Sequence, residues 1–302
     1  MQIGMIRNTI IGLMMIGSAS AAEQVEIISS IPVAGSGGQI GAGITQILNK
    51  VQAEREYKFV VSPGAQGDTS ALKALVDAKT QNVVMFNGIS VTTTNRLLNP
   101  NAGFDRDKDF IQSVGIGKNY YAIMVSPDSS INNIDELVKS IKNKPKAFFS
   151  TTLTAPGSVI INDIFLKRYA LEGKVDSINY KSPQDIILAL NNKESDYTIF
   201  TVSDMTNLKA IMVSSEKRLV QFPDAHTAKE DGFNGFSLSS ILMFSVPKER
   251  AGFQRTFEED MKKVCAHPDY ERVANIRAPY RSECMTPADT MATVENELRT
   301  IK

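Results

Sequence analysis

A stretch near the start of the chain decides the fold. It opens with a strand-like run, Val25-Glu-Ile-Ile-Ser-Ser-Ile31, and continues into a glycine-rich turn, Pro32-Val-Ala-Gly-Ser-Gly-Gly38. Between Ile40 and Val51 the apolar residues recur every three or four positions, which is the spacing of one helix face. The stretch therefore predicts a buried strand, a turn and a helix, which together form the first part of a β-α-β unit.

The same alternation continues outward along the chain. Residues 58–61 and 82–86 are predicted strands on either side of a helix at 71–78. The pattern restarts with a strand over 121–125. Further strands are predicted at 146–150, 176–180, 196–201 and 209–214, and helices at 134–141, 159–169 and 184–191. The C-terminal part is predicted to be mainly helical, over 249–266, 270–276 and 287–301. Strands that alternate with helices favour parallel sheets with crossover helices.

Two α/β halves of similar construction follow from this pattern. No linker rich in Pro, Gly or Ser separates them, and the joints near residues 118–121 and 237–241 resemble extended strands. We therefore predict two α/β domains that share crossover strands. Domain 1 is expected to comprise residues 22–121 and 241–302, and domain 2 residues 122–240.

Composition excludes several classes of function. The chain has 302 residues, and its 33 Lys and Arg balance 33 Asp and Glu, which argues against a nucleic-acid partner. Two His and two Cys leave little room for a zinc site, and we predict no metal and no cofactor. His226 and His267 lie in no catalytic motif, and no Gly-x-Ser-x-Gly elbow occurs. The charge run at residues 105–109 is interpreted as a solvated turn, because it lacks the spacing of a calcium loop.

The first 21 residues are typical of a secretory signal peptide. One basic residue precedes a short apolar run, and Ala19-Ser20-Ala21 provides a small-x-small cleavage site. We predict cleavage after Ala21 and a soluble, periplasmic mature protein. An uncleaved amphipathic anchor is the alternative, and either Met1 or Met5 could be the true start.

Export changes the interpretation of Cys265 and Cys284, the only cysteines. In an oxidising compartment we expect them to form a disulfide, and two separate buried thiols are the alternative.

Two turns between a strand and a helix are candidates for ligand binding. Residues 35–38 are Gly-Ser-Gly-Gly, and residues 151–158 carry hydroxyl groups, with Thr154 as a helix cap and Pro156 in the first helical turn. The free amides and the dipole at a helix N-terminus favour an anion. Each turn alone could equally be a tight turn or a capped helix start. If both turns face one cleft, they would hold an anion between the two halves.

Six short motifs, in this order, resemble the receptors of tripartite tricarboxylate transporters, also called Bug receptors. The motifs are the turn at 32–38, Pro-Gly-Ala-Gln-Gly at 63–67, Phe-Asp-Arg-Asp-Lys-Asp-Phe at 104–110, Ile-Asn-Tyr-Lys at 178–181, Lys217-Arg218, and the segment with Phe-Pro-Asp at 222–224, Thr227 and Glu-Asp-Gly at 230–232. The resemblance implies a type II periplasmic-binding-protein fold, a closing ligand cleft and a small carboxylate ligand.

The family's binding loops map onto three turns of this sequence. The resulting candidate ligand-binding residues are Ala34, Gly35, Ser36, Gly37, Gly38, Gln39, Asn87, Ser90, Thr151, Thr152, Thr154, Gly157, Ser158 and Thr201. Two departures favour a divergent ligand: Gln39-Ile40 replaces the family's Thr-Asp, and the loop at 151–159 lacks the family's glycines and histidine. Gly38 is expected to accept an aspartate that blocks the anion site without unfolding the protein.

The resemblance implies a monomeric, non-enzymatic receptor that delivers a small carboxylate metabolite to membrane permease subunits. Two alternatives remain at this point. One is a ligand-sensing adaptor that presents its closed form to a sensor kinase, which sequence cannot distinguish from a transport receptor. The other is a periplasmic enzyme on the same scaffold, which the missing nucleophile–base pair disfavours.

Overall fold

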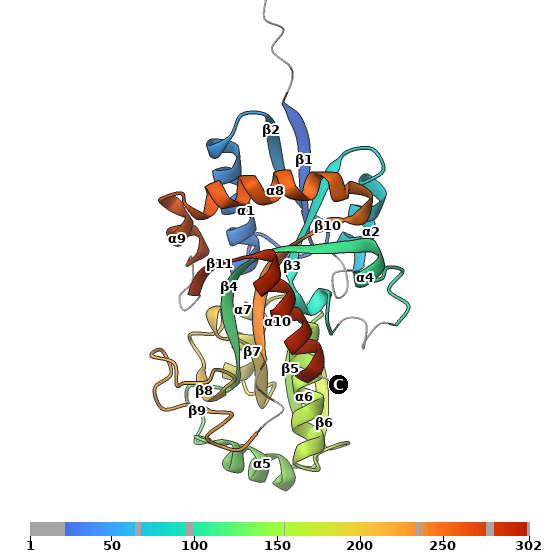
Figure 1. Ribbon diagram of the computed structural model, residues 1–302. Coiled ribbons are helices and arrows are strands. Elements are labelled where there is room, and N and C mark those ends of the chain that lie inside the picture. The colour runs from blue at the N-terminus through green and yellow to red at the C-terminus, as the bar shows by residue number, and fades with distance from the viewer. Residues whose placement is uncertain are drawn as a thin grey trace, which may run out of the picture.

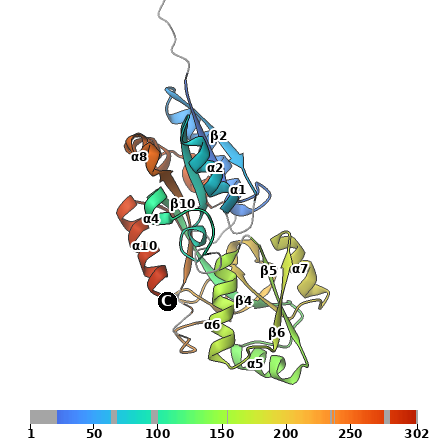
Figure 2. The same ribbon diagram turned by 90° about the vertical axis from the view of Figure 1, so that its right-hand side faces the viewer.

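The computed structural model describes residues 22–63, 68–94, 100–153, 155–233, 236, 238–275 and 281–300. The predicted signal peptide, residues 1–21, lies outside the described residues. Figure 1 shows two lobes, one above the other, with long strands running between them. Each lobe consists of a sheet with both parallel and antiparallel strand pairs, flanked by helices, and Figure 2 shows the same two bodies from the side.

The first lobe is built on the sheet order β2-β1-β3-β10-β4. Its strands are β1 (Glu23–Ser29), β2 (Arg55–Val61), β3 (Asn82–Gly88), β10 (Ser239–Pro247) and the first part of β4 (Phe110–Val125). β1 is parallel to both neighbours, as the predicted β-α-β order requires, whereas β10 returns antiparallel to β3.

The second lobe repeats this plan in the order β6-β5-β7-β4. Its strands are β5 (Ala147–Thr152), β6 (Val175–Tyr180), β7 (Tyr197–Thr201), β8 (Lys209–Val213) and β9 (His226–Thr227), with the second part of β4. β5 is parallel to β6 and β7, and β4 is antiparallel to β7. In each lobe, three parallel strands are therefore followed by an antiparallel strand that enters from the other lobe. This strand is β10 in the first lobe and β4 in the second.

β4 is the main connection between the lobes and is longer than predicted. Sequence alone indicated a strand over 121–125 and extended chain at 118–121, but β4 is one strand of 16 residues. Its first part pairs with β10, and from Tyr121 onward it pairs with β7. The lobes are therefore connected by continuous hydrogen-bonded sheet, which limits their relative motion to bending and twisting of these strands.

Helices cover the sheets at the predicted places. They are α1 (Ser36–Val51), α2 (Asp68–Asp77), α4 (Arg106–Asp109), α5 (Ile134–Asn143), α6 (Pro156–Arg168), α7 (Pro183–Asn191), α8 (Ala251–Cys265), α9 (Asp269–Ala274) and α10 (Pro287–Thr300), with 3-10 turns η2 (Ile89–Val91), η3 (Val202–Asp204) and η5 (Lys248–Arg250). Asn133 caps α5 by accepting a hydrogen bond from the Glu136 amide, and Thr286 caps α10 by accepting one from the Asp289 amide.

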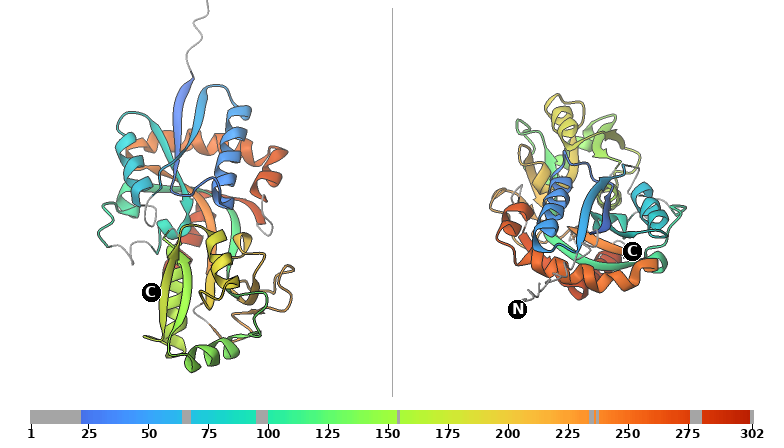
Figure 3. Two further views of the ribbon diagram at one scale, coloured as in Figure 1. Left: turned by 180° about the vertical axis from the view of Figure 1, so that it is seen from behind. Right: turned by 90° about the horizontal axis from the view of Figure 1, so that it is seen from above.

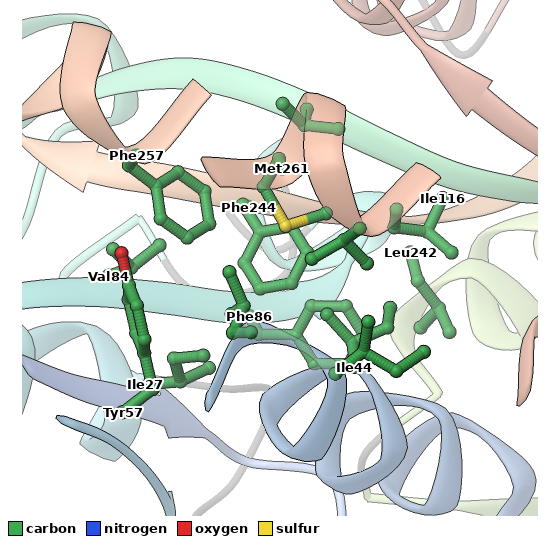
Figure 4. Packing of buried hydrophobic residues seen from close by; sticks show 14 of the residues in the cluster. Ile27, Ile44, Tyr57, Val84, Phe86, Ile116, Leu242, Phe244, Phe257 and Met261 are labelled. Carbon is green, nitrogen blue, oxygen red and sulfur yellow. The ribbon is translucent and has the colours of Figure 1, made fainter. Parts of the chain in front are cut away.

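The core of the first lobe lies between its sheet, α1 and α8, which crosses the other face of the sheet (Figure 4). Phe244 lies 4.7 Å from Phe86 and 5.1 Å from Phe257, measured between ring centroids. On α1, a side chain at Gly41 would place its Cβ 2.5 Å from the Phe59 ring. Only glycine lets α1 approach the sheet this closely, and this approach fixes the position of its N-terminus.

One strand was missed in the C-terminal part, which was predicted to be mainly helical. β11 (Arg281–Met285) pairs with β4 at the edge of the first lobe's sheet. The predicted helix over 270–276 is shorter, since α9 ends at Ala274. The structure joins Cys265, at the end of α8, to Cys284 on β11 in a disulfide, with the two Cα atoms 6.0 Å apart. This bond holds β11 against α8.

Candidate functional site

The turn between β5 and α6 contains buried hydroxyl groups. β5 ends at Thr152 and α6 begins at Pro156, and the Ala155 amide closes the turn by donating to the Thr152 carbonyl at 3.1 Å. Thr151 is 1% exposed and Ser158 is fully buried, and within the described part of the chain neither Oγ atom has a hydrogen-bond partner. A buried hydroxyl left unpaired costs about 1–3 kcal/mol, so these two groups point to a ligand that would satisfy them.

The start of α6 lacks a side-chain cap. Its N-cap residue is Ala155, which makes no side-chain hydrogen bond, so the prediction that Thr154 occupies the cap position is wrong. Thr154 itself lies outside the described residues. Gly157 packs against Tyr121, because a Cβ at Gly157 would lie 2.3 Å from the Tyr121 hydroxyl oxygen. In the first turn of α6, Pro156 has no amide hydrogen and the Ser158 amide donates to the Ala155 carbonyl at 3.0 Å. The Gly157 amide and the helix dipole are what this turn offers an external anion.

The sheet register brings Thr201 to the same place. Thr201 is the last residue of β7 and lies opposite Tyr121 of β4. In the parallel pair of β5 and β7, Ser150 lies opposite Thr198, so the turn after Thr152 and the end of β7 lie at the same edge of the sheet. Neighbouring strands are about 4.8 Å apart. Thr151, Thr152, Gly157, Ser158 and Thr201 therefore lie toward the same edge of the second lobe's sheet, and their role in ligand binding stays a prediction.

The first lobe contributes the start of α1. Gly35 is the N-cap residue and makes no side-chain hydrogen bond, and its amide donates to the Pro32 carbonyl at 3.0 Å. Ala34 is exposed and Gln39 half-buried, whereas Ser36, Gly37 and Gly38 are buried. Figure 3 (left) shows α1, in blue, in the upper lobe, with its lower end directed toward the other lobe. Here too the helix N-terminus carries no cap from its own loop.

The prediction that Gly38 would accept an aspartate is wrong. A Cβ at Gly38 would lie 2.1 Å from the Pro32 carbonyl oxygen and 2.8 Å from the Val33 Cα. Both atoms belong to the backbone of the binding loop, so any side chain at this position displaces the loop. Gly38 shapes the turn, and its substitution would not test anion binding alone.

Asn87 and Ser90 follow β3 in the first lobe. Asn87 is 1% exposed, and its Oδ1 accepts hydrogen bonds from the amide and hydroxyl of Ser30, both at 2.8 Å, while its Nδ2 donates to Ser70 at 3.0 Å. This network ties the ends of β1 and β3 to α2, which makes Asn87 a support of the first loop. Ser90 lies in η2, which packs against α6 of the other lobe.

Sequence reasoning missed a carboxylate that joins the lobes. Asp204, in η3, accepts a hydrogen bond from the Ser36 hydroxyl at 2.7 Å and one from Thr201 at 3.2 Å. Asn119 of β4 stabilises η3, because its Nδ2 donates a hydrogen bond to the Ser203 hydroxyl at 2.7 Å. Asp204 lies in the short segment after β7, which none of the motifs in the sequence analysis includes. Nothing in that segment predicts contact with α1.

Other motifs of the sequence have local structural roles. Asp105 caps α4 by accepting from the amides of Asp107 and Lys108, so the charge run forms a short exposed helix. Thr227 and Glu230 form a capping box, in which the Thr227 amide donates to Glu230 at 2.7 Å and the Glu230 amide donates to Thr227 at 3.1 Å. Among the described residues, no cluster of three His, Cys, Asp or Glu side chains is arranged to hold a metal ion.

Each lobe contributes the N-terminus of one helix, α1 in the first lobe and α6 in the second, and Asp204 of the second lobe contacts the start of α1. The two-lobed fold is that of the type II periplasmic binding proteins. Within the described ranges, every helix falls short of the length and apolarity needed to cross a membrane. The chain belongs to the tripartite tricarboxylate transporter receptor family, whose model matches residues 63–284. The glycine turn at 32–38 lies outside that match.

Solved structures share this fold at low sequence identity. The periplasmic binding protein BugD is 17% identical, with a TM-score of 0.76, over 93% of this chain and 96% of its own. Rpa4515 of R. palustris, solved with adipate, is 15% identical, with a TM-score of 0.76, over 92% of this chain and 94% of its own. MatC from Rhodopseudomonas palustris, solved with malate, is 12% identical, with a TM-score of 0.71, over 93% of this chain and 99% of its own. No curated protein sequence matches the chain.

Proposed function

We propose that this protein is an exported receptor that captures a small carboxylate between its lobes and delivers it to the permease of a tripartite transporter. The observation that carries the proposal is the pair of buried hydroxyls of Thr151 and Ser158 at the start of α6, neither of which has a hydrogen-bond partner among the residues that the structure describes. A ligand carboxylate there would accept both hydroxyl hydrogens and complement the helix dipole.

Family membership and the relatives support the same class of ligand. The family is that of tripartite tricarboxylate transporter receptors, and two structural relatives were solved with adipate and with malate. The proposal includes cleavage of residues 1–21 on export to the periplasm. It also includes movement of residues 22–121 with 241–302 against residues 122–240, by bending of the connecting strands. The closed form would present a surface that the permease recognises.

The test is a binding titration of ligand-stripped mature protein with a panel of small carboxylates, by calorimetry and thermal shift. A carboxylate at 100 times its Kd should add about 2.7 kcal/mol to the free energy of unfolding. In Thr151→Val and Ser158→Ala, the Kd should rise about tenfold to a hundredfold, because a hydrogen bond to a charged group contributes roughly 1.5–3 kcal/mol.

Stability distinguishes a ligand-binding hydroxyl from a structural one. Because the Thr151 hydroxyl is unpartnered and buried, Thr151→Val should leave the ligand-free protein as stable as before or more stable. The matched control is Thr45→Val on α1, where the hydroxyl donates to the Gly41 carbonyl at 2.8 Å. That variant should lose stability and keep its affinity. The proposal is wrong if no carboxylate binds the protein, or if Thr151→Val destabilises it and leaves the Kd unchanged.

A further inference from the structure

Asp204 places a carboxylate of the second lobe against the start of α1 in the first. Its Oδ1 accepts from the Ser36 hydroxyl at 2.7 Å, and its Oδ2 accepts from Thr201 at 3.2 Å. Ser36 is 2% exposed and is the first residue of α1. The contact joins residues 168 positions apart in the sequence. A side chain of the protein is therefore bound where a ligand carboxylate would otherwise meet the first lobe.

The start of α1 is favourable for such a group. The first amides of a helix have no intrahelical acceptor, and the dipole favours negative charge. Gly35 provides no side-chain cap, and the Ser36 hydroxyl already donates a hydrogen bond to Asp204. The Ser36 hydroxyl at α1 thus contacts a carboxylate of the protein itself, whereas the hydroxyls of Thr151 and Ser158 at α6 remain unpartnered within the described residues.

We propose that Asp204 is a specificity-determining residue that restricts the ligand to one carboxylate, bound at α6, and rejects dicarboxylates. This inference rests on the proposed function. Thr201, which donates to Asp204, lies at the same sheet edge as the β5–α6 turn. A second carboxylate on a ligand bound at α6 would therefore extend toward the Asp204 side of the cleft.

Coulomb repulsion sets the size of the expected discrimination. Two carboxylates about 6 Å apart, at an effective dielectric constant of about 20, repel enough to weaken binding about a hundredfold. Partial solvation of the cleft reduces this effect, so we expect a preference of about tenfold or more for a monocarboxylate over a dicarboxylate of the same length. The part of the ligand that faces Asp204 should be uncharged or cationic.

The experiment compares hexanoate with adipate, two acids of equal chain length that differ by one carboxylate. Their Kd values are measured by calorimetry on the mature protein and on Asp204→Asn, which removes the charge and retains an oxygen that accepts from Ser36. The native protein should prefer hexanoate at least about tenfold, and Asp204→Asn should reduce or reverse this preference by a similar factor. Asp204→Ser is the second variant if the asparagine form does not fold.

The matched control is Asp176→Asn, which removes the same charge from the second lobe at the opposite end of its sheet. Asp176 lies near the start of β6, is 57% exposed, and pairs with Lys146 at 2.8 Å. The control should keep the native preference.

The outcomes separate this inference from the proposed function. If the native protein binds adipate as tightly as hexanoate, and Asp204→Asn changes neither affinity, the specificity role of Asp204 is refuted while the carboxylate receptor stands. If neither these two acids nor any other acid of the panel binds any of these proteins, the proposed function fails and this inference fails with it.

Discussion

Glu297 provides a test of how this fold buries an acid. The side chain lies on α10, is 5% exposed, and its Oε1 accepts from Thr93 at 2.8 Å, while Oε2 is buried with no partner among the described residues. Burial raises the pKa of Glu297 to about 8 from the ordinary value of 4.5 for a glutamate, although the Thr93 hydrogen bond partly opposes this. In the folded protein at neutral pH the acid is therefore mostly protonated.

The sign of the pH dependence follows from linkage. Below about pH 4.5 the folded and unfolded states both hold the proton, so the contribution of Glu297 to stability is complete. Between about pH 4.5 and 8 the unfolded state releases the proton and the folded state keeps it, so the free energy of unfolding falls as pH rises. At 1.36 kcal/mol per pKa unit, the loss by pH 8 is at most about 5 kcal/mol.

The perturbation is Glu297→Gln, which mimics the neutral acid and cannot ionise. Urea unfolding of both proteins from pH 5 to 9 should give similar stabilities at pH 5 and a more stable variant above pH 8. Glu295→Gln, an exposed position on the same helix, is the control and should follow the native protein. Parallel stability curves for the native protein and Glu297→Gln across this range would refute the reasoning.

Two further predictions concern other parts of the fold. Gly157→Ala should weaken carboxylate binding at least about tenfold in a titration, because its Cβ would lie 2.3 Å from the Tyr121 hydroxyl oxygen. Gly252 is at the equivalent position of α8, and a Cβ there has open space. Gly252→Ala should therefore raise the free energy of unfolding by about 0.5–1 kcal/mol. Equal affinity of the Gly157→Ala and native proteins would contradict this packing. Reduction of the Cys265–Cys284 bond, which spans 19 residues, should cost roughly 3 kcal/mol in the free energy of unfolding; an unchanged urea midpoint after reduction would show that β11 is held without it.

Sequence alone determined the type of most elements and the place of the binding turns. The run at 25–31, the glycine turn after it and the helical spacing up to Val51 are local signals, because strand and helix periodicity depends on neighbouring residues. The hydroxyl-rich turn at 151–158 was predictable for the same reason, since it follows a strand and precedes an apolar helix. Parallel β-α-β order then places both turns at the carboxyl ends of strands.

Tertiary structure alone decided what those turns meet. The bond between Ser36 and Asp204 joins positions 168 residues apart, and the burial of Glu297 depends on Thr93, 204 residues away. β11 forms because β4 offers a sheet edge to a segment whose own sequence does not predict a strand. Contacts between distant segments depend on how whole lobes pack, and the periodicity and motif spacing of the sequence carry no information on that packing. The candidate turns were therefore evident in the sequence, whereas the carboxylate that shapes their specificity was visible only in the fold.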